Sequence, residues 1–257
     1  LASGSHGGSI QLWDVASRHL LGGLLPKHPD SVRKLAFSPD GKVLASGSNG
    51  PTIVLWDVAS RQPLGDSLTG NRHRLGNYAY RPENSVGSLT FSPDGKTLAF
   101  GSGSGSILFW DVANRQLIGD PLKGQQSRIE SLAFSPDGKT LASGSEHGTI
   151  VRLDALPLVP LSSYGSILLW NVANRQLLGD MLTGGQGSAE SLAFSPDGKT
   201  LASGSHGGSI QLWDVASRQP LGDPLTGHVS TVESLAFHQD GKTLRSGSKD
   251  GTILLWD

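Results

Sequence analysis

Histidine is the residue type in this chain that could most readily bind a transition metal, because the sequence contains eight histidines and no cysteine. Imidazole clusters bind zinc or copper, and such sites usually show paired short spacings or an i, i+4 pair. The histidines that fall in expected turns and loops lack this spacing: His6, His28, His73, His147, His206 and His228. Two of them come from one duplicated phrase, Ser-His-Gly-Gly-Ser. We therefore expect no metal site and no cofactor.

Two further patterns resemble chemical sites only at first sight. The tetrapeptide Ser-Pro-Asp-Gly supplies a recurrent carboxylate at Asp40, Asp94, Asp137 and Asp197. Hairpin turn chemistry explains each copy, and one identical aspartate per repeat cannot make a catalytic pair. The run Gly-Ser-Gly-Ser-Gly at 101–105 precedes an expected strand, so no helix N-terminus is available to hold a phosphate. We find no catalytic set and expect a protein that is not an enzyme.

The composition is compatible with a protein that folds around a hydrophobic core and whose surface has no strong net electrostatic potential. The 257 residues hold 21 Lys and Arg against 22 Asp and Glu, which makes nucleic acid an unfavoured partner. No stretch approaches the roughly 18 apolar residues of a membrane helix. The lack of cysteine is compatible with a reducing compartment, and we expect a cytoplasmic location. Leu1 is no translation start and Met181 is the one methionine, so we expect a piece of a longer chain.

The sequence is built from a repeat of 43 residues. Residues 1–18 return unchanged at 201–218, and residues 131–145 return at 191–205. One repeat position holds every tryptophan: Trp13, Trp56, Trp110, Trp170, Trp213 and Trp256. Each unit predicts four short strands, typified by SLAF, TLASGS, SIQLWD and RQPLGDPL, which we call strands a, b, c and d in that order. Proline in the fourth segment suits an edge strand. Such a sheet cannot bury both faces alone, so copies must stack around an axis.

The motif spacing resembles a known family. Gly227-His228, followed by AFHQDGKTLRSGSKDGTILLWD and ending at Trp256-Asp257, resembles a WD40 repeat, and the resemblance covers essentially the whole chain. It implies an all-β fold, a WD40 β-propeller of four-stranded antiparallel blades. The phrase DVASRQPLGDPLTGH is also similar to bacterial multidomain WD40 proteins, in which the propeller accompanies a signalling domain.

The family resemblance also assigns a buried polar tetrad. Many WD40 blades join a loop histidine, a strand-b serine or threonine, a turn aspartate and the strand-c tryptophan by hydrogen bonds. In the last blade these are His228, Ser246, Asp250 and Trp256. We favour this structural role over a hydrolase triad, because no oxyanion hole is implied. Elsewhere the tetrad is eroded. The aspartate position holds Gly7, Gly50, Ser104, His147 and Gly207, and the histidine position holds His28, Gln125 and Gly185.

The blade count is close to six. We expect one domain, 1–257, with partial blades at 1–25, 155–182 and 231–257, and leave ring closure open. A seven-bladed alternative stays open if the stub at 155–182 holds a blade position. Missing strands would leave unpaired edges, through which the chain could self-associate.

The largest departure from the repeat is a long loop at 71–85. Arg and Tyr are enriched at binding hot spots, and the loop contributes six candidates for contact with a partner: Arg72, His73, Arg74, Tyr78, Tyr80 and Arg81. A neutral surface insertion is the alternative. We expect a non-enzymatic scaffold that binds a protein or peptide, within a larger bacterial signalling protein. Two alternatives stay open: a propeller enzyme or binder of a small ligand or metal, and filler repeats without autonomous function.

Overall fold

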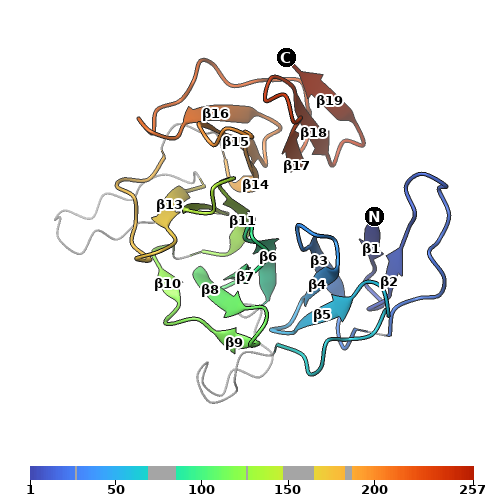
Figure 1. The fold of residues 1–257 in the computed structure, drawn as a ribbon. Coiled ribbons are helices and arrows are strands. Elements are labelled where there is room, and N and C mark those ends of the chain that lie inside the picture. Colours follow the sequence, from blue (N-terminus) through green and yellow to red (C-terminus); the bar gives the residue numbers. More distant parts are fainter. Residues whose placement is uncertain (27, 69–84, 126, 147–164, 183–186) are drawn as a thin grey trace. The chain divides into compact units, whose positions relative to one another are not determined.

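A computed structural model describes residues 1–26, 28–68, 85–125, 127–146, 165–182 and 187–257. These residues form antiparallel sheets joined by turns, and the sheets in these ranges number six (Figure 1). The all-β fold expected from the sequence is confirmed. The described part contains no helix that is long and apolar enough to span a membrane. Two compact units are distinguished, and each is described by itself.

The first unit comprises residues 1–103 and 108–120. It opens with a two-stranded sheet, β1 (Ala2–Gly4) and β2 (Ile10–Leu12). A three-stranded sheet follows, made of β3 (Val32–Phe37), β4 (Val43–Ser48) and β5 (Ile53–Asp57). The next sheet contains β6 (Val86–Phe91), β7 (Thr97–Ser102), β8 (Ser106–Asp111) and β9 (Gln116–Leu117). The division between the units runs through β8.

The second unit comprises residues 104–107 and 121–257. Here β10 (Leu122–Lys123) pairs with Ser106 and Ile107 of β8. Three three-stranded sheets follow: β11 (Ile129–Phe134), β12 (Thr140–Ser145) and β13 (Ile167–Asn171); β14 (Ala189–Phe194), β15 (Thr200–Ser205) and β16 (Ile210–Asp214); β17 (Val232–Phe237), β18 (Leu244–Ser248) and β19 (Ile253–Trp256).

Strand β13 lies in the region for which the sequence predicted a separate partial blade, 155–182. It pairs with β12 along its length, from Asn171 opposite Thr140 to Ile167 opposite Gly144. The described part of that region, 165–182, therefore completes the sheet of β11 and β12. The other candidate for a third strand, the segment that ends at Asp154, lies outside the described residues.

The Ser-Pro-Asp-Gly turn sets the first hairpin of each three-stranded sheet in which it occurs. Between β14 and β15, Ser195 Oγ donates to Asp197 Oδ1 over 2.6 Å, and the same carboxylate accepts the Lys199 N–H. Gly198 takes a φ of 71°, which costs glycine little and other residues more. These hydrogen bonds lower the pKa of Asp197, the serine bond most. The turn aspartates thus have the local role that hairpin chemistry predicts.

The fourth, outer strand is much reduced compared with the sequence prediction. Beside β16 it pairs only at two points, where Trp213 faces Pro220 and Ile210 faces Leu225. Between them Gly222 adopts a φ of 67°, which bends the segment. Proline has no N–H to donate, so an outer edge is the position where it does least harm. A continuous ladder is therefore replaced by two contacts around a glycine bend.

Apolar clusters join each sheet to the next within a unit. In the first unit, Ile53 and Leu55 of β5 pack with Val86 and Leu89 of β6. In the second, Ile210 of β16 packs in one cluster with Val232 of β17. Strand a of one sheet thus covers the strand-b and strand-c face of the preceding sheet. This is the stacking that the repeat requires, because one face of a single sheet has too little apolar cover.

An arginine ends the turn after strand c in five of the described sheets, and the structure gives it a second role. The residues at this position have φ values of 55–62°, unusual for a side chain larger than glycine: Arg18, Arg61, Arg115, Arg175 and Arg218. Arg218 Nη1 donates to the carbonyl of Leu178, in the outer segment of the preceding sheet, over 2.6 Å. It occupies the space that a Cβ at Gly179 would need. The arginine therefore ties neighbouring sheets together.

Candidate functional site

The residues most able to do chemistry gather in buried polar clusters beside the tryptophans. Within the described residues, five strand-b serines accept a hydrogen bond from the indole Nε1 of the same sheet at 2.8–2.9 Å. The pairs are Ser3–Trp13, Ser46–Trp56, Ser143–Trp170, Ser203–Trp213 and Ser246–Trp256. The indole N–H is only a donor, so it needs such an acceptor when it is buried. The acceptor is the first of the two serines in the TLASGS segment.

In the last sheet a histidine extends this pair into the expected group of four. His228 Nε2 lies 2.7 Å from Ser246 Oγ, and its Nδ1 lies 3.2 Å from Asp250 Oδ2 and 3.0 Å from Thr252 Oγ1. Because Trp256 donates to Ser246, the serine hydroxyl can donate onward to Nε2, which leaves the proton on Nδ1 facing the carboxylate. The structure therefore brings together all four residues that the sequence analysis named for this cluster, and it adds a fifth, Thr252.

The carboxylate of Asp250 is held in its ionised form. The Thr252 hydroxyl donates to it at 2.6 Å, and the backbone N–H groups of Thr252 and Val229 donate at 2.8 and 3.0 Å. These donors hold the pKa of Asp250 well below its ordinary range, the Thr252 hydroxyl contributing most. The aspartate therefore fixes the histidine and also the start of the loop at Val229.

The same geometry argues against hydrolytic use of the serine. Ser246 is 1% exposed, and its oxygen is shared between the indole of Trp256 and the imidazole of His228. A nucleophile needs access to a substrate carbonyl and a free lone pair directed toward it. Ser246 has neither, so the cluster is not arranged as a hydrolytic triad.

In the sheet of β11–β13 a glutamine takes the place of the histidine. Gln125 Oε1 accepts from Ser143 Oγ at 2.9 Å, and its Nε2 donates to Ser166 Oγ at 3.1 Å and to the Ser166 carbonyl at 3.0 Å. Ser166 precedes β13 as Thr252 precedes β19. A carboxamide can both accept and donate, so it meets the same two hydroxyls. Gln125 therefore makes the hydrogen bonds that His228 makes in the last sheet, although the sequence lacks a histidine at this position.

In the sheet of β3–β5 the missing turn aspartate is replaced from another loop. Gly50 stands at the aspartate position, but Asp30 Oδ2 accepts from Thr52 Oγ1 at 3.3 Å and Ser48 Oγ at 3.5 Å. His28 in the same loop is fully buried, and its Nδ1 lies 3.1 Å from the Asp30 carbonyl. Burial lowers the pKa of His28, the largest effect on this group. Sequence alignment by position missed Asp30 because it lies 20 residues before Gly50.

One tryptophan lacks this support. Phe100 occupies the strand-b position that is serine in the other sheets, and the Trp110 Nε1 is buried with no hydrogen-bond partner among the described residues. Phe100 packs in the same apolar cluster as Trp110. Among the described residues, Trp110 thus has apolar contacts where the neighbouring sheets have a hydrogen bond.

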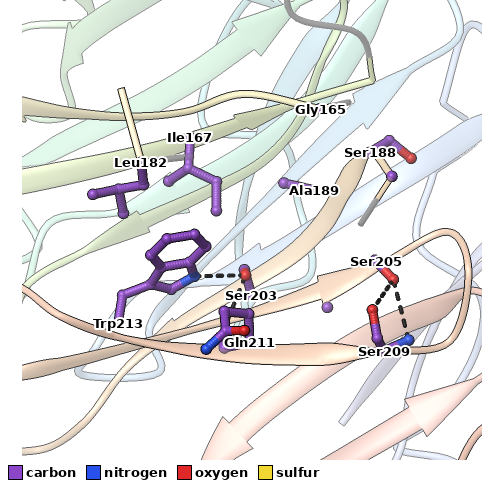
Figure 2. Close-up of a pocket in the computed structure, with 12 residues that line it drawn as sticks. Gly165, Ile167, Leu182, Ser188, Ala189, Ser203, Ser205, Ser209, Gln211 and Trp213 are labelled. Atoms are coloured by element: carbon purple, nitrogen blue, oxygen red, sulfur yellow. Dashed lines mark hydrogen bonds between the residues drawn. The ribbon is translucent and has the colours of Figure 1, made fainter. Parts of the chain in front are cut away.

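A small cavity lies between the sheet of β14–β16 and the segment that contains β13, with Ile167 and Leu182 on the β13 side (Figure 2). Its volume of 20 Å³ suits about one water molecule. Ser203 and Trp213, which line it, are bonded to each other at 2.8 Å, and Ser205 Oγ lies 2.9 Å from Ser209 Oγ. Ser246 and Thr252, the counterparts of Ser203 and Ser209 in the last sheet, contact His228. The Gly185 expected at the histidine position lies outside the described residues.

The six residues of the expected partner-binding loop lie outside the described residues, within 69–84. The described ends of this loop are held in place. The Leu68 N–H donates to the Ile53 carbonyl at 2.7 Å, and Val86 begins β6. Among the residues that the structure describes, no group of three or more His, Asp or Glu side chains could hold a metal ion.

Comparison with known proteins gives the following matches. The family model described as WD domain, G-beta repeat matches residues 21–57, 77–111, 116–151, 178–214 and 219–257. A search of curated proteins returns no match. Among solved structures, a chain of "Crystal Structure of Mitotic Checkpoint Complex" is similar over 99% of this chain and 70% of its own length, with 21% identity and a TM-score of 0.78. At that identity the likeness concerns the fold alone.

Proposed function

Because the chain belongs to the WD40 repeat family and has its β-propeller fold, we propose that it is a non-enzymatic scaffold. It binds a protein or peptide through the loop at 71–85, as a cytoplasmic module of a larger bacterial signalling protein. The observation that carries the proposal is the contrast between repeated and non-repeated residues. The repeated polar groups, such as Ser246 and His228, are buried and bonded to each other.

The loop at 71–85 departs from the repeat and holds the recognition chemistry. It contains three arginines and two tyrosines. Such side chains combine apolar area with directed hydrogen bonds, and they are frequent at binding hot spots. The mitotic checkpoint structure is an assembly of proteins, which supports a protein partner for a chain of this fold. The near balance of charge argues against a nucleic acid.

A pull-down tests the loop. The chain is used as bait against lysate of the source cells, beside a variant in which Arg72, Arg74 and Arg81 are alanine. A matched control carries alanine at three lysines of hairpin turns, Lys42, Lys139 and Lys199. We expect the loop variant to lose partners that the wild type and the control both recover. Equal recovery by all three proteins would refute the assignment.

A further inference from the structure

The turn that joins β4 to β5 contains an asparagine followed by a glycine. Asn49 is exposed, and the next residue, Gly50, is buried. The equivalent position of the other sheets holds a different residue type: His6, Gly103, Glu146, His206 or Lys249. The backbone nitrogen of a glycine can approach the side-chain amide of the residue before it, because glycine has no side chain that shields it. Asn49 is therefore a position at which the chain can modify itself.

A cation is bonded to the side-chain carbonyl oxygen of Asn49. Arg33 Nη1 donates to Asn49 Oδ1 at 2.9 Å. A guanidinium in this position withdraws electron density from the amide carbon, and it stabilises the negative charge that develops on the oxygen when a nucleophile attacks. The backbone of Asn49 is held as well, because its N–H donates to the Ser31 carbonyl at 3.1 Å. The amide of Asn49 is thus both positioned and polarised.

The backbone nitrogen of Gly50 is connected to a carboxylate through one hydroxyl group. The Gly50 N–H donates to Ser48 Oγ at 3.1 Å, and Ser48 Oγ lies 3.5 Å from Asp30 Oδ2. The hydroxyl also lies 3.2 Å from the Gly50 carbonyl, and Ser48 is fully buried. A Cβ at Gly50 would lie 3.1 Å from the same Asp30 oxygen, so glycine leaves room for the carboxylate. A carboxylate one hydroxyl away from the proton it removes satisfies the geometry of a general base.

We propose that Asn49 is a self-modification site at which the folded chain deamidates through a succinimide. The Gly50 nitrogen passes its proton through Ser48 Oγ to Asp30. The nitrogen attacks Cγ of Asn49, and the negative charge that develops on Oδ1 faces Arg33. The bond between Cγ and the amide nitrogen then breaks, and that nitrogen leaves as ammonia with the proton that Asp30 received. Water opens the succinimide ring at either carbonyl, which gives aspartate or isoaspartate at position 49.

The product differs from the starting chain in charge and in backbone length. A carboxylate at position 49 faces Arg33 in place of the neutral amide, so an ion pair replaces the present hydrogen bond. Isoaspartate also lengthens the backbone of a turn whose strands pair at Gly47 and Ile53. The turn between β4 and β5 therefore has two chemical states. The loop at 71–85 plays no part in this reaction, so the proposal is independent of the scaffold function.

The test incubates the full chain in neutral buffer and follows its tryptic fragments by mass spectrometry. Fragment 43–61 carries Asn49, and fragment 97–115 carries Asn114, which an arginine follows, as an internal control. We expect the first fragment to gain the mass that exchange of –NH2 for –OH produces, and the second to stay unchanged. The gain should be faster in the folded chain than in the chain unfolded in guanidinium chloride, because only the folded chain aligns the base and the cation. Labelling by an isoaspartyl methyltransferase identifies the isomer.

Two variants separate this mechanism from ordinary chemical ageing. Arg33→Gln removes the cation and Ser48→Ala breaks the path to Asp30, and each should slow conversion of the folded chain about tenfold. Lys42→Gln, at an exposed lysine of the same sheet, is the matched control and should convert at the wild-type rate. If Ser48→Ala disturbs folding, Arg33→Gln decides the question, because Arg33 is exposed. The proposal is overturned by no conversion, by equal or faster conversion of the unfolded chain, by a wild-type rate in either folded variant, or by a backbone break after Asn49.

Discussion

Replacement of His228 is the sharpest test of the buried polar cluster. The side chain is fully buried and bonded to Ser246 at 2.7 Å, Thr252 at 3.0 Å and Asp250 at 3.2 Å. Alanine would remove these bonds and leave a cavity, so we expect a loss of about 2–4 kcal/mol from the free energy of unfolding. Glutamine should cost only about 1 kcal/mol, because Gln125 performs the same task in the sheet of β11–β13.

The measurement must report on the last sheet, because repeat proteins can open locally. Native-state hydrogen exchange at the amides of β18 gives that local free energy, and urea unfolding followed by tryptophan fluorescence gives the global value. Val229→Ala is the matched control, because the neighbouring Val229 is 88% exposed; its effect should lie within about 0.5 kcal/mol. The reasoning is refuted if His228→Ala is as mild as the control, or if glutamine destabilises the sheet as much as alanine.

Three further predictions concern single sheets. Trp213→Phe should cost about 1 kcal/mol more than Trp110→Phe in urea unfolding, since Trp213 donates to Ser203 whereas Trp110 has no hydrogen-bond partner among the described residues. Gly179→Ala should lower the melting temperature more than Gly222→Ala. Both glycines have a positive φ, of 75° and 67°, but a Cβ would meet the next sheet's arginine only at the first. Burial lowers the pKa of His28. The unfolded chain therefore binds a proton that the folded chain does not, and the free energy of unfolding falls as pH drops below about 6.5. His28→Gln should reduce that fall, measured by urea titration between about pH 7 and pH 5; an unchanged fall would contradict the assignment.

The sequence by itself determined the first three strands of each repeat and the hairpins between them, but not the extent of the fourth strand. Each depends on residues that are close in the chain. Ser195, Asp197 and Gly198 supply the hydrogen bond and the positive φ that form the turn before β15. The alternating pattern of SIQLWD likewise predicts its own strand. The tryptophan spacing fixed the repeat and with it the family. The tetrad of the last sheet was also accessible from sequence, because His228, Ser246 and Asp250 all stand at their repeat positions.

The tertiary structure decided which residues replace missing ones. Gln125 reaches Ser166 across 41 positions, and Asp30 reaches Thr52 across 22, so alignment by repeat position does not reveal either pair. It also decided that β13 completes the sheet of β11 and β12. The physical reason is that a side chain's environment is set by the strands packed against it.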